Sequence, residues 1–158
     1  MPILRPEHVE FLNGARRAVL ATVAPSGLPR LVPICFAVVD GDSGPVLYSA
    51  LDEKPKRTTD PHALARVRDV AARPGVSLLA DRWDEDWRLL AWLRVDAVAG
   101  LLEPGGQEHE QAVLTLRARY RQYGTHALEA LPLLRLAPTR AVWWSGARLP
   151  METDPDPG

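Results

Sequence analysis

The stretch Ala18-Val19-Leu20-Ala21-Thr22-Val23 is a compact apolar run with β-branched members, and Ala24-Pro25-Ser26-Gly27 follows it directly. Apolar runs bounded by Pro and Gly are typical of short strands that end in tight turns. A second run covers residues 30–39, and a third, Val46-Leu47-Tyr48-Ser49, comes after another Gly-rich turn. Three strands joined by tight turns predict an antiparallel meander rather than βαβ units. Pro33 lies inside the second run, so this strand is expected to be bent, bulged or at a sheet edge.

Further along the chain, the same criteria predict strands over residues 76–81, 89–102 and 134–144. Helical spacing of apolar residues, with Pro or Gly at the ends, predicts helices over about 6–14, 60–74 and 108–120. Six antiparallel strands close more readily as a barrel than they lie open, because closure removes the edges. The sequence therefore predicts a mainly-β fold with helices: one six-stranded antiparallel β-barrel domain over residues 1–149, and a disordered tail over residues 150–158.

Length and composition bound the function. The chain has 158 residues and a formal net charge of -1, whereas general nucleic-acid binders usually carry a basic excess. No apolar run approaches the roughly 20 residues of a membrane span, and the first ten residues lack the apolar region of a signal peptide. Cys35 is the only cysteine, so no intrachain disulfide is expected. These features predict a cytoplasmic protein that binds neither nucleic acid nor membrane.

No catalytic side chain stands out from the sequence. The four histidines are scattered, and none forms a helical i, i+4 pair with another, so no metal site is expected. Neither a serine nor the cysteine lies in a nucleophile motif. A Gly-rich dinucleotide fingerprint and a Walker loop are also absent.

The basic stretch Lys54-Pro55-Lys56-Arg57 holds both lysines of the chain, and Arg66 and Arg68 lie near the start of the following helix. Such a charge run is often a solvated loop. The positive end of a helix also favours anions, so these cations form a candidate phosphate site. Two or three charge-assisted hydrogen bonds, each contributing about 1.5–3 kcal/mol, would anchor a phosphate.

The segment Asp81-Arg82-Trp83-Asp84-Glu85-Asp86-Trp87 connects two predicted strands. It is either a solvated turn or the rim of a pocket in which Arg82 or Trp83 faces a planar ring. Trp143 and Trp144 are adjacent on a predicted strand, so one points inward and the other outward. The outward one indicates a dimer surface or a ligand wall.

The order of these features resembles the pyridoxamine-phosphate-oxidase-like split-barrel family. The resemblance covers roughly residues 5–146, and the motifs that carry it are Val19-Leu20-Ala21-Thr22-Val23, Pro29 to Phe36, Leu47-Tyr48-Ser49, Ala65-Arg66-Val67-Arg68-Asp69-Val70 and Val76-Ser77-Leu78-Leu79-Ala80-Asp81. The stretches Asp52-Glu53-Lys54-Pro55-Lys56-Arg57, Arg82 to Trp87 and Trp92-Leu93-Arg94-Val95-Asp96 are similar to its coenzyme F420 branch.

The resemblance implies an FMN-binding split barrel that forms a homodimer, with two cofactors in grooves at the interface. It implies that Ser49 and Arg66 hold the cofactor phosphate, that the backbone around Pro33 lies along the ring system, and that the Asp81–Trp83 segment approaches the cofactor. Many relatives have Lys at the Arg66 position, and arginine keeps the charge but changes the geometry. The expected cofactor-binding residues are Pro33, Ser49, Ala50, Lys54, Lys56, Arg57, Arg66, Asp81, Arg82 and Trp83.

The leading hypothesis is an oxidoreductase that transfers hydride between coenzyme F420 and a small organic substrate. F420 carries a phosphodiester and an anionic glutamate tail, so it takes more cations than FMN, and Lys54, Lys56 and Arg57 would supply them. The alternatives are an FMN-dependent oxidoreductase and a non-enzymatic module that binds flavin or haem. In the enzymatic hypotheses the chemistry belongs mainly to the cofactor, which explains why no catalytic acid–base pair stands out in the sequence.

Overall fold

The computed structural model describes residues 2–51 and 60–148. Lys54, Lys56 and Arg57, and the tail predicted over residues 150–158, lie outside these described residues. Within the described residues, no helix is long and apolar enough to cross a bilayer.

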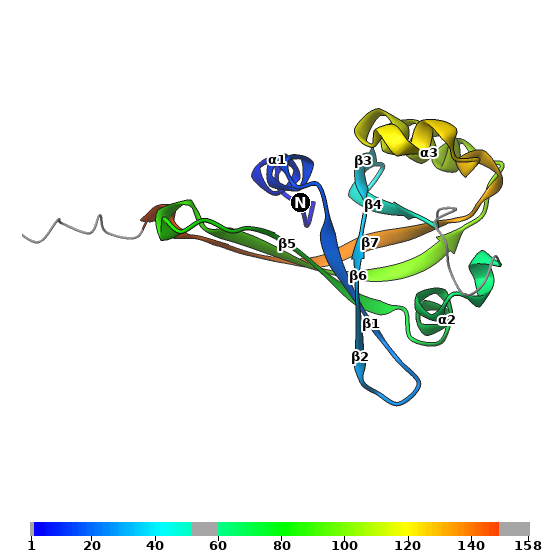
Figure 1. Ribbon diagram of the computed structural model, residues 1–158, viewed down its shortest axis with the longest axis horizontal. Helices are drawn as coiled ribbons and strands as arrows, with labels where there is room; N and C mark the ends of the chain where they lie inside the picture. The colour runs from blue at the N-terminus through cyan, green and yellow to red at the C-terminus, as the bar shows by residue number, and fades with distance from the viewer. Residues whose placement is uncertain (1, 52–59, 149–158) are drawn as a thin grey trace, which may run out of the picture.

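In the described part of the chain, seven strands form one antiparallel sheet (Figure 1). They are β1 (Ala18–Val23), β2 (Pro29–Ile34), β3 (Ala37–Gly41), β4 (Gly44–Ala50), β5 (Gly75–Arg82), β6 (Ala91–Leu102) and β7 (Leu133–Ser145). The order across the sheet is β2-β1-β5-β6-β7-β4-β3, so β2 and β3 are its two edges and no ladder closes it. The mainly-β prediction is confirmed, whereas the predicted count of six strands and the closed barrel are wrong.

The seventh strand arises because residues 30–39 do not form one strand. The chain leaves β2 at Ile34 and enters β3 at Ala37, and these two strands lie at opposite edges of the sheet. Consecutive Cα atoms are 3.8 Å apart, so the Cα atoms of Ile34 and Ala37 are at most about 11 Å apart. The sheet must therefore curl until its edges approach each other at this link. Pro33 lies on the edge strand β2, which pairs only with β1, as one of its predicted placements allowed.

The two linking residues, Cys35 and Phe36, have their backbone groups satisfied by side chains. The Ser49 hydroxyl donates a hydrogen bond to the Cys35 carbonyl oxygen at 2.8 Å. The Phe36 amide donates to the Tyr120 hydroxyl at 3.1 Å, and the same hydroxyl lies 3.1 Å from the Phe36 carbonyl oxygen. Buried backbone groups that lack a ladder partner need such side-chain partners, so Ser49 and Tyr120 fix the link.

Among residues 2–51 and 60–148, three α-helices cover the sheet, as the sequence predicts (Figure 1). They are α1 (Pro6–Gly14), α2 (Ala65–Ala72) and α3 (Gln107–Arg119), and short 3-10 turns occupy Pro61–Ala63, Trp87–Leu89, Arg121–Thr125, Leu128–Ala130 and Gly146–Arg148. One core packs α1 and α2 against the sheet through buried residues such as Leu12, Leu20, Val67 and Leu93. A second core lies under α3 and includes Val46, Leu116 and Leu133.

Asp69 on α2 fixes this helix to β1 and β2. Its carboxylate is buried and accepts hydrogen bonds from the Thr22 hydroxyl at 2.8 Å and from the Arg30 guanidinium at 2.7 Å. Burial alone would raise the pKa of Asp69, but the hydrogen bonds from Arg30 and Thr22 outweigh it and hold the pKa below its usual 3.8. A charged group with this many partners stabilises the fold only while it stays ionised.

We expect Asp69→Asn to lower the free energy of unfolding by about 1–3 kcal/mol at pH 7, because Arg30 then lacks its carboxylate partner. The folded-state pKa of Asp69 is lowered, so its contribution is present above about pH 4 and is lost as the pH falls through the folded-state pKa. Urea unfolding at pH 7 and at pH 3 measures the effect. The difference between wild type and variant should shrink at pH 3, and an equal difference at both pH values would contradict this role. Asp42→Asn, at an exposed turn, is the control.

Candidate functional site

The predicted site residues Ser49, Ala50 and Arg66 are separated from Asp81, Arg82 and Trp83 by the length of β5, and Pro33 lies on the edge strand β2. Figure 1 shows α2 well away from the far end of β5. Ser49 and Ala50 end β4, and Arg66 lies in the first turn of α2. Asp81 and Arg82 end β5, and Trp83 follows them. From Gly75, which follows α2, the strand covers six residues and about 20 Å to reach Asp81. One copy of the chain therefore brings Asp81, Arg82 and Trp83 together but keeps them away from Arg66.

Asp81, Arg82 and Trp83 line a cavity of about 850 Å³ between α1 and the arm formed by the end of β5, the start of β6 and the end of β7. Its wall is partly aromatic. The Phe11 and Trp143 rings meet edge to face with their centroids 4.7 Å apart, and the Arg82 guanidinium carbon lies 5.8 Å from the centre of the Phe11 ring. Trp83 is 69% exposed at the rim.

One face of α1, which the sequence did not indicate as part of a site, also lines the cavity. Glu7, Glu10, Phe11 and Gly14 line it together with Ala15, Arg16 and Arg17. Residues spaced by three, four and seven positions share one face of a helix, so this stripe could have been found from the sequence. The apolar residues Leu4, Val9 and Leu12 define the core side of this segment instead.

Three arginines and three acids line the cavity, and several of them already have partners. Arg82 Nε donates to the Leu89 carbonyl oxygen at 2.7 Å. The guanidinium of Arg16 donates to the Arg119 carbonyl oxygen at 2.8 Å, and Glu7 lies 3.1 Å from Arg5. Glu10, Arg17 and Asp81, by contrast, form no ion pair or side-chain hydrogen bond with the rest of residues 2–51 and 60–148, which leaves these charges to the solvent or a ligand.

The predicted site residues on β4 and α2 are less accessible to solvent than Trp83 at the cavity. Ser49 is 2% exposed and its hydroxyl donates to the Cys35 carbonyl oxygen, and Ala50 is also buried. Arg66 is half-buried. The Ser49 hydroxyl is thus engaged in the link between β2 and β3, and a phosphate contact would require it to leave that bond.

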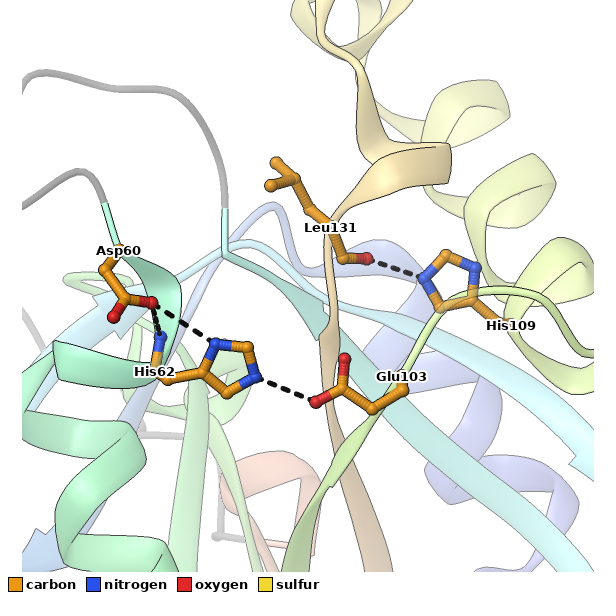
Figure 2. Close-up of polar contacts among 5 residues, drawn as sticks. All are labelled: Asp60, His62, Glu103, His109 and Leu131. Atoms are coloured by element: carbon orange, nitrogen blue, oxygen red, sulfur yellow. Dashed lines mark hydrogen bonds and ion pairs between the residues drawn. The ribbon is translucent and has the colours of Figure 1, made fainter.

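Two histidines form the polar contacts shown in Figure 2. His62 Nδ1 lies 3.2 Å from Asp60 Oδ1, and its Nε2 lies 2.8 Å from Glu103 Oε1. These bonds, to Glu103 first and to Asp60 next, raise the pKa of His62. The Nε2 of buried His109 lies 2.7 Å from the Leu131 carbonyl oxygen. Among the described residues, no three His, Cys, Asp or Glu side chains cluster as metal ligands would.

A further ionisable cluster joins α3 to the sheet. The Tyr48 hydroxyl and Arg135 Nε both donate to Glu108 Oε1 at 2.5 Å. Burial, followed by the Glu108 carboxylate, raises the pKa of Tyr48 to about 12. The hydrogen bonds from Tyr48 and Arg135 hold the pKa of Glu108 below its usual value. These three groups satisfy one another, so the cluster serves the packing of α3.

Residues 4–145 match the family model described as pyridoxamine 5'-phosphate oxidase. No curated protein matches significantly. Among solved structures, a conserved hypothetical protein of Mycobacterium tuberculosis is similar with a TM-score of 0.71 and 19% identity, over 98% of this chain and 94% of that one.

Two further solved structures are similar to this chain. HutZ, described as the haem storage protein of Vibrio cholerae, has a TM-score of 0.62 and 22% identity, over 92% of this chain and 95% of that one. A protein described as an F420 reductase has a TM-score of 0.61 and 19% identity, over 88% of this chain and 98% of that one. At these identities the similarity shows the fold alone.

The hydrogen bond of Ser49 to the Cys35 carbonyl favours a structural role for Ser49 over a contact with a phosphate. We expect Ser49→Ala to lower the free energy of unfolding by about 1–3 kcal/mol, because the part-buried Cys35 carbonyl loses its donor. The affinity for FMN should change less than twofold. Urea unfolding and equilibrium FMN binding are the measurements, and Ser43→Ala, at an exposed turn, is the matched control. A large loss of affinity with unchanged stability would instead identify Ser49 as a phosphate ligand.

Proposed function

Because this chain belongs to the pyridoxamine 5'-phosphate oxidase family, we propose that it is an oxidoreductase that binds a flavin-type cofactor and transfers hydride between it and a small organic substrate. We further propose that coenzyme F420 is bound in preference to FMN. The observation that carries the proposal is the cavity between α1 and the arm, with an aromatic wall and three arginines.

The residues of the cavity fit a planar ring that carries anionic groups. Phe11 and Trp143 offer apolar surface for such a ring, and Trp83 stands at the rim with most of its surface free. Aromatic pairs of this kind bind planar ligands by offset or edge contacts. When bound, a reduced flavin or deazaflavin supplies the hydride. The task of this chain is to orient the ring and to exclude water beside it.

The preference for F420 rests on the number of cations. F420 is more anionic than FMN, and Arg16, Arg17 and Arg82 line the cavity. Arg66 lies at the start of α2. Lys54, Lys56 and Arg57, which lie outside the described residues, would add to the cations at the α2 end. Because each charge-assisted contact contributes about 1.5–3 kcal/mol, the larger set favours the more anionic cofactor.

We propose that the functional unit is a homodimer. Arg66 is on α2, which lies far from the end of β5 that carries Asp81 and Arg82 (Figure 1), so a single cofactor can contact both groups only when a second copy supplies one of them. The outer face of the sheet supports this arrangement. Leu31, Leu79 and Trp144 lie on this face and are exposed, and contiguous exposed apolar surface marks interaction sites.

Haem storage is less well supported by the side chains. A histidine that ligates iron needs a ring nitrogen free of other partners. Both ring nitrogens of His62 are occupied by carboxylates, and His109 is buried with its Nε2 against a carbonyl oxygen (Figure 2). The cavity lined by His62 therefore offers no ready axial ligand, and the aromatic cavity beside α1 contains no histidine.

Equilibrium binding should show tighter binding of F420 than of FMN. Arg66→Ala should weaken F420 binding roughly tenfold to a hundredfold, because a cation near the phosphate contributes about 1.5–3 kcal/mol. Arg73→Ala, at the exposed C-terminal end of the same helix, is the control and should retain wild-type affinity. Tenfold tighter binding of FMN would reverse the order of the two cofactors.

Light scattering at micromolar concentration should give about twice the chain mass of 17.4 kDa. Leu79→Asp introduces a charge into the outer sheet face and should yield monomers with weakened cofactor binding. Leu114→Asp changes an equally apolar side chain on α3 that is 62% exposed, and should leave the dimer intact. A wild-type monomer that binds cofactor with full affinity would contradict the dimer proposal.

A further inference from the structure

The C-terminal end of α1 is capped by a side chain from a distant helix. The last carbonyls of a helix have no partner within it and carry a partial negative charge, and α1 has no basic residue in its last turn. Arg119 at the end of α3 supplies the missing cation. Its guanidinium donates to the Asn13 carbonyl oxygen at 2.8 Å, to that of Leu12 at 3.0 Å and to that of Ala15.

Arg119 is itself held in place. Its Nε donates to the Tyr120 hydroxyl at 3.1 Å, and its guanidinium carbon lies 4.9 Å from the centre of the Phe36 ring. Phe36 is fully buried. A guanidinium fixed by hydrogen bonds and by an aromatic face keeps one position, so the end of α1 meets a permanent positive charge.

Gly14, which ends α1, and the next three residues, Ala15 to Arg17, form one edge of the cavity beside α1. We call them the Gly14–Arg17 edge. The guanidinium of Arg16 is fixed by the Arg119 carbonyl oxygen and lies 4.8 Å from the centre of the Tyr120 ring. Arg17 is exposed and has no side-chain partner among residues 2–51 and 60–148. Without Arg119, an anion at this edge would lie against the partially negative carbonyl oxygens at the end of α1. With Arg119 bonded to these carbonyls, the anion can contact Arg16 and Arg17 instead.

We propose that the Gly14–Arg17 edge binds an anionic group, a phosphate or a carboxylate, of the ligand in the cavity, and that Arg119 is the positioning residue that makes this possible. The identity of the ligand rests on the proposed function. Of the three acids that line the cavity, Glu7 pairs with Arg5. Glu10, one turn of α1 before Gly14, and Asp81 have no such partner among the described residues and oppose an anion, so Arg16 and Arg17 must outweigh them at this edge.

The chain offers a matched control in Arg117, on the same helix. Its Nε donates to the Tyr123 carbonyl oxygen at 3.1 Å, and its NH2 group donates to the His126 carbonyl oxygen at 2.7 Å. It therefore also clamps backbone carbonyls, but in the segment after α3, and it does not line the cavity. Arg119→Gln and Arg117→Gln should both lower stability, and only Arg119→Gln should change the binding of anions.

The experiment measures the affinities of FMN and of riboflavin, which has the same ring without the phosphate. Arg119→Gln should weaken FMN binding about threefold to tenfold at low salt, with a smaller loss at high salt. Riboflavin binding should change less than twofold, and Arg119→Lys should restore part of the FMN affinity. Equal losses for both ligands, the same loss in Arg117→Gln, or no loss would overturn the inference.

A second titration separates this inference from the proposed function. Inorganic pyrophosphate, added to the wild-type protein, should shift the backbone amide signals of the Gly14–Arg17 edge, and the shifts should be lost in Arg119→Gln. If the wild type binds neither F420 nor FMN, the proposed function fails, while these shifts would still support the anion site. Absence of the shifts in the wild type would overturn the inference whether or not a cofactor binds.

Discussion

The two-residue link between β2 and β3 is the constraint on which the rest of the structure depends. Ile34 and Ala37 belong to opposite edges of a seven-stranded sheet, yet only Cys35 and Phe36 separate them. A link this short forces the sheet to curl, and it leaves backbone groups that no ladder satisfies. Side chains from elsewhere in the chain satisfy them instead. The curl therefore depends on polar contacts as well as on the packing of Phe36 in the core.

The same contacts connect the link to the cavity. Tyr120 bonds the backbone of Phe36, and its hydroxyl also accepts from Arg119, which stacks on the Phe36 ring. Arg119 in turn holds the end of α1, whose exposed face forms one wall of the cavity. A continuous set of contacts thus runs from the curl of the sheet to the position of α1. Loss of packing at Phe36 would change the position of α1 at the cavity, because the contacts that fix α1 start at Phe36.

Local sequence predicted the elements well and their long-range arrangement less well. The apolar runs around Leu20, Leu78 and Leu93 became strands because alternation sets one buried face, which is a local property. The break after Ile34 was missed because it depends on pairing with strands far along the chain, and Pro33, the local signal, lies short of it. At the candidate site, the sequence indicated Arg82 and Trp83, which line the cavity, because they lie in a turn rich in aromatic and charged residues. The contribution of Arg119 was hidden, since its partners are more than 100 residues away.

The outer face of the sheet combines exposed apolar side chains with a central group of charges that are paired with one another. Its apolar members are cross-strand neighbours: Val19 pairs with Leu79, and Trp92 with Trp144. The polar groups among them satisfy one another, because Ser77 donates to Asp96 at 2.8 Å and Arg94 pairs with the same carboxylate at 3.3 Å. Desolvation of an unpaired charge opposes association, and this applies to Asp81 on the same face, whereas Arg94 and Asp96 are already paired. In the proposed homodimer, a second copy on this face would gain apolar contact with Leu31, Leu79 and Trp144, and the paired charges of Arg94 and Asp96 would lower the electrostatic cost of that contact.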